Sequence, residues 1–252
     1  MARYADDIAQ RTSGCQVMID LGAGDCVKAE RLFSRLRPQQ YVPVDISTEY
    51  LRGAVARVRA SHPALDIVAL GQDFSQDLSL PADVRDEGRL FFYPGSSIGN
   101  FTPDEALKFL RRVRERASGG GLLIGVDLVK PHDVLQRAYD DALGVTAAFN
   151  LNLLRQLNRL IGSDFEPRQW QHVGLYNEAQ SRIEMHLEAR EDLVVRWDGA
   201  QRRFARGERI HTENSYKYTL ERFSALLEAA GFASTRHWSD ERGWFAVFWA
   251  NA

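Results

Sequence analysis

The stretch Val17–Asp25 constrains the fold of this chain most strongly. An apolar run ends in Asp20, a turn with Gly22 and Gly24 follows, and residues 29–36 are amphipathic. This order predicts a strand, a tight turn and a helix. Glycine lets the backbone approach a ligand where a Cβ atom would collide, and a helix N-terminus offers unpaired N–H groups to a polar ligand. The stretch therefore predicts an α/β fold with a ligand site at this turn.

A second acid, Asp45, ends the next apolar run, about 20 residues beyond the glycines, where a carboxylate can hold ribose hydroxyls. A dinucleotide site needs a third glycine soon after Gly24, but Val27 stands at that position. The D-x-G-x-G form with a ribose acid instead suits S-adenosylmethionine (SAM), and it resembles the first motif of class I SAM-dependent methyltransferases. A glycine turn that binds nothing and a dinucleotide oxidoreductase remain as alternatives.

Strands and helices alternate along the first half of the chain. Apolar runs at 65–70, 89–93 and 122–128 predict further strands, and helical spacing after Ser47 predicts that this residue caps a helix. Residues 102–105 form a capping box with proline at the first helical position. The alternation predicts an α/β fold of the Rossmann-like class I methyltransferase type, with a doubly wound, mostly parallel sheet.

The pattern changes after the fifth predicted strand. A helical region continues to about residue 161, and strand-like alternation follows, with a hairpin turn at Asp198-Gly199. The chain then returns to the sheet through one helix and two closing strands. We therefore expect a SAM-binding domain of residues 1–130 and 214–252, and an α+β substrate-binding insert of residues 131–213.

Composition argues against several classes of partner. The 252 residues carry a net charge of −2, so no basic field points to nucleic acid or to an anionic membrane. No apolar run approaches the roughly 18 residues that span a bilayer, and the two cysteines suggest a reduced compartment. The histidines His132, His186, His211 and His237 do not show the sequence spacing that is typical of metal ligands. We expect a cytoplasmic monomer without a metal that acts on a small molecule.

Two further stretches follow predicted strands, where open α/β sheets place their ligands. Asp73 and Phe74 come after the third strand; the carboxylate could accept from the adenine amine and the ring could cover the base. A surface acid beside a core ring is the alternative. The loop from Gly95 to Asn100 follows the fourth strand and is rich in small residues. Asn100 offers both a donor and an acceptor, which a helix start alone would not require.

Four ordered motifs resemble those of the ergothioneine-pathway histidine Nα-methyltransferases. They are Pro94-Gly-Ser-Ser-Ile-Gly-Asn100; Asp127-Leu-Val-Lys, continuing through Ala138-Tyr-Asp-Asp-Ala142 to Gly144-Val-Thr-Ala147 and Phe149-Asn150; Arg182-Ile-Glu-Met185; and Thr212-Glu-Asn-Ser215. The resemblance covers nearly the whole chain. It implies SAM-dependent methylation of the α-amino group of L-histidine, up to trimethylhistidine (hercynine), in ergothioneine biosynthesis.

The resemblance also implies roles for individual residues. Those that would hold SAM are Gly22, Gly24, Lys28, Asp45, Asp73 and Phe74. Those that would bind the amino acid are Gly95, Asn100, Tyr139, Met185, Glu213 and Ser215. Among them, Asn100 and Tyr139 would act as catalytic residues by gripping the carboxylate and amine end. Glu213 and Ser215 would hydrogen-bond the imidazole, and Met185 would pack against it.

The chemistry of these residue types agrees with the implied roles, although each has an alternative. A carboxylate such as Glu213 suits an imidazole N–H and would favour histidine over apolar amino acids. Glu213 could equally pair with Arg209 or Lys217. Met185 on an alternating strand could be a core residue, and Tyr139 beside two acids could lie on a solvated helix face.

The chain departs from the family pattern before the glycine turn. Family members carry a further segment there, which supplies tyrosines to the substrate pocket, whereas here the preceding stretch is short and Tyr4 is a poor match. We therefore expect an intact SAM half and an incomplete histidine half. The alternative functions are a SAM-binding family member with another amino-acid substrate, and one without catalysis because the N-terminal segment is missing.

Overall fold

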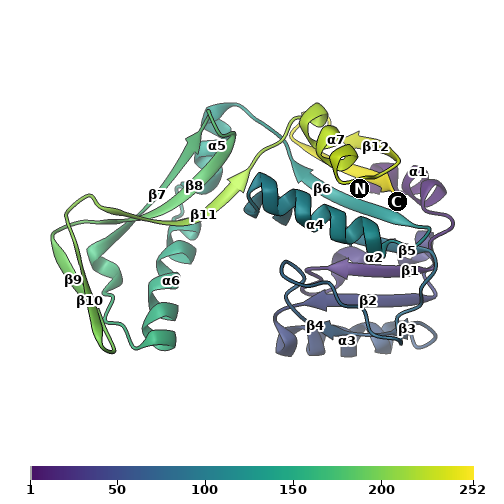
Figure 1. Ribbon diagram of the computed structural model, residues 1–252, viewed down its shortest axis with the longest axis horizontal. Helices are drawn as coiled ribbons and strands as arrows, with labels where there is room; N and C mark the ends of the chain where they lie inside the picture. The colour runs from purple at the N-terminus through teal and green to yellow at the C-terminus, as the bar shows by residue number, and fades with distance from the viewer. Residues whose placement is uncertain (1) are drawn as a thin grey trace. The chain divides into compact units, whose positions relative to one another are not determined.

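The computed structural model describes residues 2–252, which form two compact units (Figure 1). The first unit combines the chain up to Leu128 with Tyr218–Ala252, and the second is Val129–Lys217. These bounds lie a few residues from those predicted from the sequence. The difference at the second bound arises because a strand of the second unit continues to Tyr216.

The first unit is built on an eight-stranded sheet with the order β12-β13-β6-β5-β1-β2-β3, in which β4 also pairs with β2. Its strands are β1 (Val17–Leu21), β2 (Gln40–Asp45), β3 (Asp66–Ile67), β4 (Leu70–Gly71), β5 (Arg89–Tyr93), β6 (Gly121–Asp127), β12 (Ser234–Ser239) and β13 (Phe245–Asn251). All pairs are parallel except those that β13 makes with β6 and β12. The predicted Rossmann-like, mostly parallel sheet is therefore confirmed.

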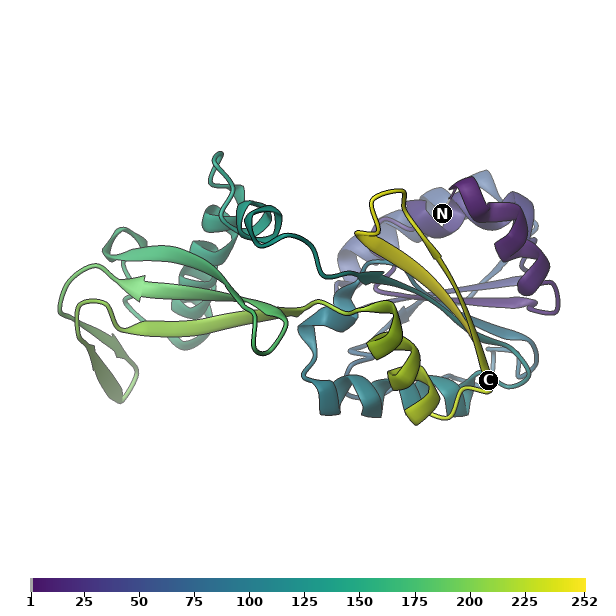
Figure 2. The ribbon, with the colours of Figure 1, turned by 90° about the horizontal axis from the view of Figure 1, so that it is seen from above.

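Helices cover both faces of this sheet (Figure 2). They are α1 (Ala5–Arg11), α2 (Val27–Leu36), α3 (Thr48–Ser61), α4 (Pro103–Arg116) and α7 (Leu220–Ala229), with short 3-10 turns η1 (Ala2–Tyr4) and η2 (Ser97–Asn100). The helices α1, α2 and α3 lie on one face, and α4 and α7 lie on the other. This cover explains why every residue of β1 is buried and why its sequence is a nearly continuous apolar run.

The predicted strand at 65–70 is interrupted in the structure. The short β3 pairs with β2 at Gln40 and Tyr41, whereas β4 pairs with it at Val44 and Asp45. Pro43 lies between these two points of contact. Since proline has no N–H to donate to a ladder, we attribute the break to this residue.

The capping predictions have different outcomes. The side chains of Thr102 and Glu105 form the predicted reciprocal capping box at the start of α4. Thr219 likewise accepts from a backbone N–H in the first turn of α7. Ser47 is the N-cap residue of α3, as predicted, but its side chain makes no capping hydrogen bond. Instead, the Ser47 backbone N–H donates to Asp45 Oδ1 at 2.9 Å.

The second unit contains a three-stranded antiparallel sheet in the order β11-β8-β7. Its elements are α5 (His132–Tyr139), α6 (Val145–Ile161), η3 (Pro167–Gln169), β7 (Trp170–Asn177), β8 (Arg182–Ala189), β9 (Leu193–Trp197), β10 (Ala200–Phe204) and β11 (Arg209–Tyr216). The strands β9 and β10 form a hairpin at the predicted Asp198-Gly199 turn. Within residues 2–252, no helix is long and apolar enough to cross a membrane.

The sheet of the second unit has two unlike faces. Alternate side chains of β8 from Ile183 to Ala189 are buried, and they pack with Leu135 of α5 and Leu154 of α6. The intervening side chains of β8, from Arg182 to Glu188, are polar and only partly buried. This alternation places the helices on one face of the sheet and leaves a polar network on the other.

A substitution of Gly125 in β6 can test how tightly the sheet packs against Pro94, in the loop that follows β5. An added Cβ atom would collide with Pro94 O and lie 2.7 Å from Phe245 Cζ. We expect Gly125→Ala to lower the free energy of unfolding by about 1–3 kcal/mol because backbone atoms cannot give way easily. Gly53→Ala is the matched control: its Cβ meets nothing within 4 Å inside α3, so the free energy of unfolding should rise by up to about 1 kcal/mol. Urea denaturation of both variants measures these changes, and equal stability of the two would contradict the assignment.

Candidate functional site

The glycine turn follows β1 at the carboxyl edge of the parallel sheet. Gly22 and Gly24 have φ angles of +68° and +53°, in a region that residues other than glycine rarely adopt. The Gly22 backbone N–H donates to Val44 O at 2.9 Å, and the Gly24 N–H donates to Asp45 Oδ2 at 2.9 Å. The turn after β1 is thereby held against the end of β2, where the sequence placed the ribose acid.

Phe74 lies beside the same turn. A Cβ atom added to Gly22 would stand 3.8 Å from Phe74 Cζ, and the Phe74 ring packs edge-on against Tyr93 at a centroid distance of 5.6 Å. Asp73 is exposed, and its Oδ1 accepts from the backbone N–H and the hydroxyl of Ser75 at 3.0 and 2.6 Å. The predicted adenine residues therefore lie on a loop that reaches the glycine turn.

The loop after β5 meets the start of α2. An added Cβ atom on Gly95 would lie 3.9 Å from Lys28 Nζ, and Ser96 adopts a left-handed conformation with φ +61°. The Ser96 hydroxyl accepts from the Asp127 backbone N–H at 2.7 Å, which ties the loop to the end of β6. Asn100 ends the turn η2 with an exposed side chain. The structure thus brings Gly95 and Lys28 together, and it leaves Asn100 open to a ligand.

Asp20 is the acid buried within β1, with 2% of its surface exposed. The Tyr41 hydroxyl donates to its Oδ2 at 2.8 Å. Burial raises the pKa of Asp20 to about 7, although Tyr41 and the positive charge of Lys28 oppose the rise. The Asp20 side chain is therefore partly in its neutral, protonated form near pH 7, whereas an exposed carboxylate is ionised there.

Four of the predicted substrate residues meet in the second unit. The Tyr139 hydroxyl at the end of α5 lies 2.8 Å from Ser215 Oγ on β11, and the Tyr139 ring packs against the cluster that contains Met185. Met185 lies directly opposite Glu213 in the ladder between β8 and β11 and is 3% exposed. Met185 is therefore both a buried residue and a neighbour of the predicted imidazole residues.

Glu213 reaches this face of the sheet because the strand is irregular. The register between β11 and β8 shifts between His211 and Glu213, and the Thr212 hydroxyl donates to Met185 O at 2.9 Å. His211 consequently pairs with His186, whereas Glu213 pairs with Met185 on the helix-covered side. Burial raises the pKa of the half-buried Glu213, and the positive charge of Lys217 opposes this rise.

The alternative partners of Glu213 are now distinguishable. Arg209 lies on the opposite face, where it donates to Glu188 at 2.7 Å. Lys217 lies on the face of Glu213 and is 1% exposed; its ammonium donates to Ser215 Oγ at 2.7 Å and to the Tyr139 hydroxyl at 2.9 Å. From the sequence alone, Lys217 is a candidate only for an ion pair with Glu213. The alternation Glu213, Ser215, Lys217 was the available signal that these side chains share a face.

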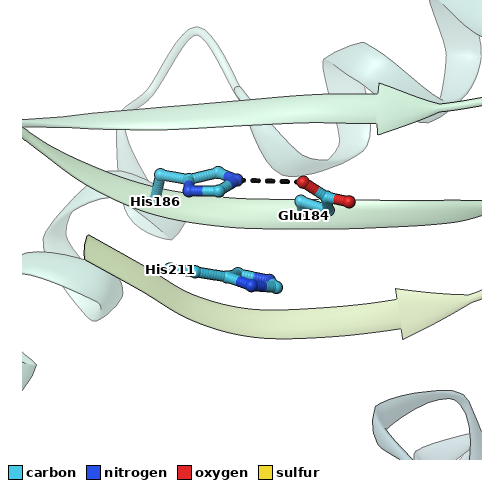
Figure 3. Close-up of side chains that lie close together, drawn as sticks. All are labelled: Glu184, His186 and His211. Carbon is cyan, nitrogen blue, oxygen red and sulfur yellow. Dashed lines mark hydrogen bonds and ion pairs between the residues drawn. The ribbon is translucent and has the colours of Figure 1, made fainter. Parts of the chain in front are cut away.

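A second polar cluster lies on the opposite face of the same sheet (Figure 3). Ligand-type atoms of Glu184, His186 and His211 lie within 4.8 Å of one another, and the two imidazole rings stack at 4.7 Å. Glu184 Oε2 lies 3.1 Å from His186 Nε2, and Oε1 accepts from Arg182 and Asn177. Burial alone would raise the pKa of Glu184, but its hydrogen bonds lower it to about 2.

The charge balance of this cluster bears on its capacity for a metal. The Arg182 guanidinium already lies 2.7 Å from the Glu184 carboxylate, so this acid has a cation beside it. An added divalent ion would face that positive charge at close range. The absence of a metal at His186 and His211 stays a prediction.

Comparisons with known proteins place this geometry in a class and then in a family. A sugar N-methyltransferase of Streptoalloteichus has a similar fold, with a TM-score of 0.55, 15% identity and cover of 99% of this chain and 86% of the other. The first unit is therefore a class I methyltransferase fold. The family of histidine-specific, SAM-dependent methyltransferases matches residues 1–252, and the chain belongs to that family.

Individual relatives agree with the family. The histidine N-alpha-methyltransferase of Mycolicibacterium smegmatis is 38% identical, over 97% of this chain and 77% of the relative. The ergothioneine biosynthesis protein 1 of Neurospora crassa is 27% identical, over 95% of this chain and 28% of that protein. The family resemblance expected from the four motifs is confirmed, and the chain is a SAM-dependent methyltransferase.

The buried carboxyl of Asp20 makes the stability of the ligand-free protein depend on pH. Its pKa is about 7 in the folded state and near 3.8 when unfolded, so the folded state binds the proton more tightly. The free energy of unfolding should therefore fall as pH rises from about 4 to about 7, and it should stay low above that range. Asp20→Asn should remove this fall and stabilise the protein above pH 7 by a few kcal/mol.

Thermal melts at pH 5 and pH 8 measure the effect. The control is Asp83→Asn, which changes an exposed acid of the same unit and should leave the pH dependence of the wild type. A melting temperature of Asp20→Asn that falls between the two pH values as steeply as in the wild type would contradict the assignment.

Proposed function

We propose that this chain transfers methyl groups from SAM to the α-amino nitrogen of L-histidine. Up to three transfers would give trimethylhistidine (hercynine), a step of ergothioneine biosynthesis. The observation that carries the proposal is the half-buried carboxylate of Glu213, which shares one sheet face with Ser215 and lies opposite the buried Met185. A carboxylate in such surroundings suits the N–H of an imidazole ring. Membership of the histidine-specific family supports the same substrate.

The first unit offers the residues for the cofactor. Gly22 and Gly24 have no Cβ atom, and a Cβ atom added to Gly22 would approach Phe74. A flat or polar group could therefore lie against the backbone there. Each oxygen of Asp45 accepts one backbone N–H and keeps a further lone pair, which suits two ribose hydroxyls. Asp73 and Phe74 would hold the adenine, with Lys28 nearby. These residues suit SAM, which has no pyrophosphate and therefore does not need a third glycine in the turn.

The remaining residues would position the amino acid. When bound, SAM supplies an electrophilic methyl group on a sulfonium sulfur, which keeps the electron pair of the broken C–S bond. Asn100 and Tyr139 would hold the carboxylate and amine end, with Gly95 lining the loop, so that the neutral amine lone pair can attack and its proton can pass to water. Glu213 and Ser215 would hold the imidazole, and Met185 would pack against the ring. Such a site works mainly by orientation.

The first experiment is a calorimetric titration of L-histidine into the protein with S-adenosylhomocysteine present, followed by mass spectrometry of a reaction with SAM. The proposal expects saturable histidine binding and products heavier by successive methyl groups. Cofactor binding without a histidine response would instead favour a SAM-binding member without catalysis. Methylation of another amino acid in preference to histidine would change the substrate but keep the reaction.

Glu213→Ala tests the imidazole role. We expect histidine affinity to fall by about 1.5–3 kcal/mol, because a hydrogen bond to a charged group is lost. Glu188→Ala is the matched control, since Glu188 lies on the opposite face of the same sheet and binds Arg209. Titration calorimetry should show the loss for Glu213→Ala alone. Equal histidine affinity in Glu213→Ala and the wild type would refute the role.

A further inference from the structure

The end of α5 is attached to β7 by hydrogen bonds, one of which reaches the backbone of Tyr139. Tyr139 is the last residue of α5, and the last four C=O groups of a helix have no partner within the helix. His172 Nε2, on β7, lies 2.7 Å from the Tyr139 carbonyl oxygen. One turn earlier in α5, the Gln136 side chain donates to the carbonyl of Gly174. A side chain of β7 therefore completes the helix end that carries a residue we assign to the substrate.

The partners of His172 determine which of its ring nitrogens carries the proton. A carbonyl oxygen only accepts, so His172 Nε2 carries a proton and donates to Tyr139 O. Asn150 Nδ2 lies 3.0 Å from His172 Nδ1 and 3.0 Å from His186 O. Because His186 O also only accepts, the amide nitrogen of Asn150 must face it, and His172 Nδ1 accepts the second amide proton. His172 is therefore a neutral ring that donates through Nε2 and accepts through Nδ1.

Asn150 connects this ring to α6. The residue is 0% exposed, and its amide nitrogen has two protons, one for each of the two acceptors. Rotating the amide by half a turn would direct Oδ1 at His186 O, so two acceptors would face each other. The amide consequently has one favourable orientation. A defined chain of hydrogen bonds thus runs from α6 through Asn150 and His172 to the backbone of Tyr139.

Close packing at Gly174 further restricts the Tyr139 carbonyl. A Cβ atom added to Gly174 would lie 3.0 Å from Tyr139 O and 3.3 Å from His172 Nε2, both closer than ordinary van der Waals contact. At the other end of the residue, the Tyr139 hydroxyl lies 2.8 Å from Ser215 Oγ and accepts from Lys217 at 2.9 Å. Tyr139 is therefore held at its backbone by β7 and at its hydroxyl by residues at the end of β11.

We propose that His172 is a positioning residue for Tyr139: oriented by Asn150, it holds the last turn of α5 so that the Tyr139 hydroxyl stays in place for the amino acid. The inference rests on the proposed function, because it takes Tyr139 as a residue that binds the amino acid. It deepens that function by assigning a role to a residue that acts through the Tyr139 backbone, with no part of the substrate as its own partner.

Two substitutions separate the two ends of the ring. In His172→Gln the amide nitrogen can reach the place of Nε2 and donate to Tyr139 O, whereas in His172→Asn the shorter amide reaches only the place of Nδ1. We expect His172→Asn to lower histidine affinity by about three- to tenfold, and His172→Gln to stay within about twofold of the wild type. Titration calorimetry with S-adenosylhomocysteine present measures both. Equal losses in the two variants, or no loss in His172→Asn, would overturn the proposal.

A double-mutant cycle shows whether His172 acts through Tyr139. Tyr139→Phe removes only the hydroxyl, and in this background His172→Asn should cost little further histidine affinity. Additive losses would count against the proposal. The affinity for S-adenosylhomocysteine is the internal control, because the residues that we assign to SAM lie in the first unit. That affinity should be the same in the wild type and in each variant, and a fall in His172→Asn would indicate a general structural effect instead of a positioning role.

Gly174→Ala displaces the same carbonyl without removing a hydrogen-bonding group, and it covers the case in which His172→Asn does not fold. The added Cβ atom would press on Tyr139 O, so α5 must shift by a few tenths of an ångström. We expect histidine affinity to fall by about two- to fivefold, since a binding site depends on geometry at that scale. Unchanged affinity in Gly174→Ala would contradict the proposal.

The ring of His172 can also be observed without a substrate. In protein labelled with 15N at histidine, the signals of His172 are those missing from His172→Gln. At neutral pH the NMR spectrum should show a ring that is protonated at Nε2 and unprotonated at Nδ1. A ring protonated at Nδ1, together with normal histidine binding, would refute the inference alone. The expected ring in a wild type that does not bind histidine would refute the proposed function, and with it the role of Tyr139 that the inference requires.

Discussion

The carboxylate of Asp45 joins two turns at the carboxyl edge of the sheet, and the geometry of the region that we assign to the cofactor depends on it. Its Oδ2 accepts from the Gly24 N–H and its Oδ1 from the Ser47 N–H. One side chain at the end of β2 therefore sets both the loop after β1 and the entry to α3. Because the positive φ angles at Gly22 and Gly24 favour glycine, the turn combines a conformational requirement with this electrostatic one.

In the three-stranded sheet of the second unit, the position of several side chains likewise depends on one local feature. A single irregularity in β11, between His211 and Glu213, changes which face the following side chains occupy. A one-residue shift in a strand moves side chains to the other face, since the side-chain period is two. The irregularity thus separates Glu213 from the Glu184–His186–His211 cluster and sets it beside the hydroxyls that we assign to the substrate.

Each of the two units contains a buried ionisable group, Asp20 in the first and Lys217 in the second, and their surroundings differ. Asp20 lies within β1, where burial raises its pKa to about 7, so the neutral acid becomes accessible. Lys217 is instead surrounded by two hydroxyl oxygens and an aromatic ring, which compensate for the water that its ammonium loses. In the first unit the proton equilibrium adapts to burial, and in the second the hydrogen-bond partners are arranged around the charge.

The sequence alone determined the features that depend on residues close along the chain. The glycine turn, the capping box at Thr102, the hairpin at Asp198-Gly199 and the alternation of the parallel sheet all follow from local pattern, and the ordered motifs indicated the family. Tertiary structure decided what depends on pairing between distant segments. The break between β3 and β4 follows from their separate contacts along β2 on either side of Pro43. The position of Phe74 beside Gly22, the face of Glu213 and the hydrogen bonds of Lys217 likewise require long-range register, which single-sequence periodicity does not specify.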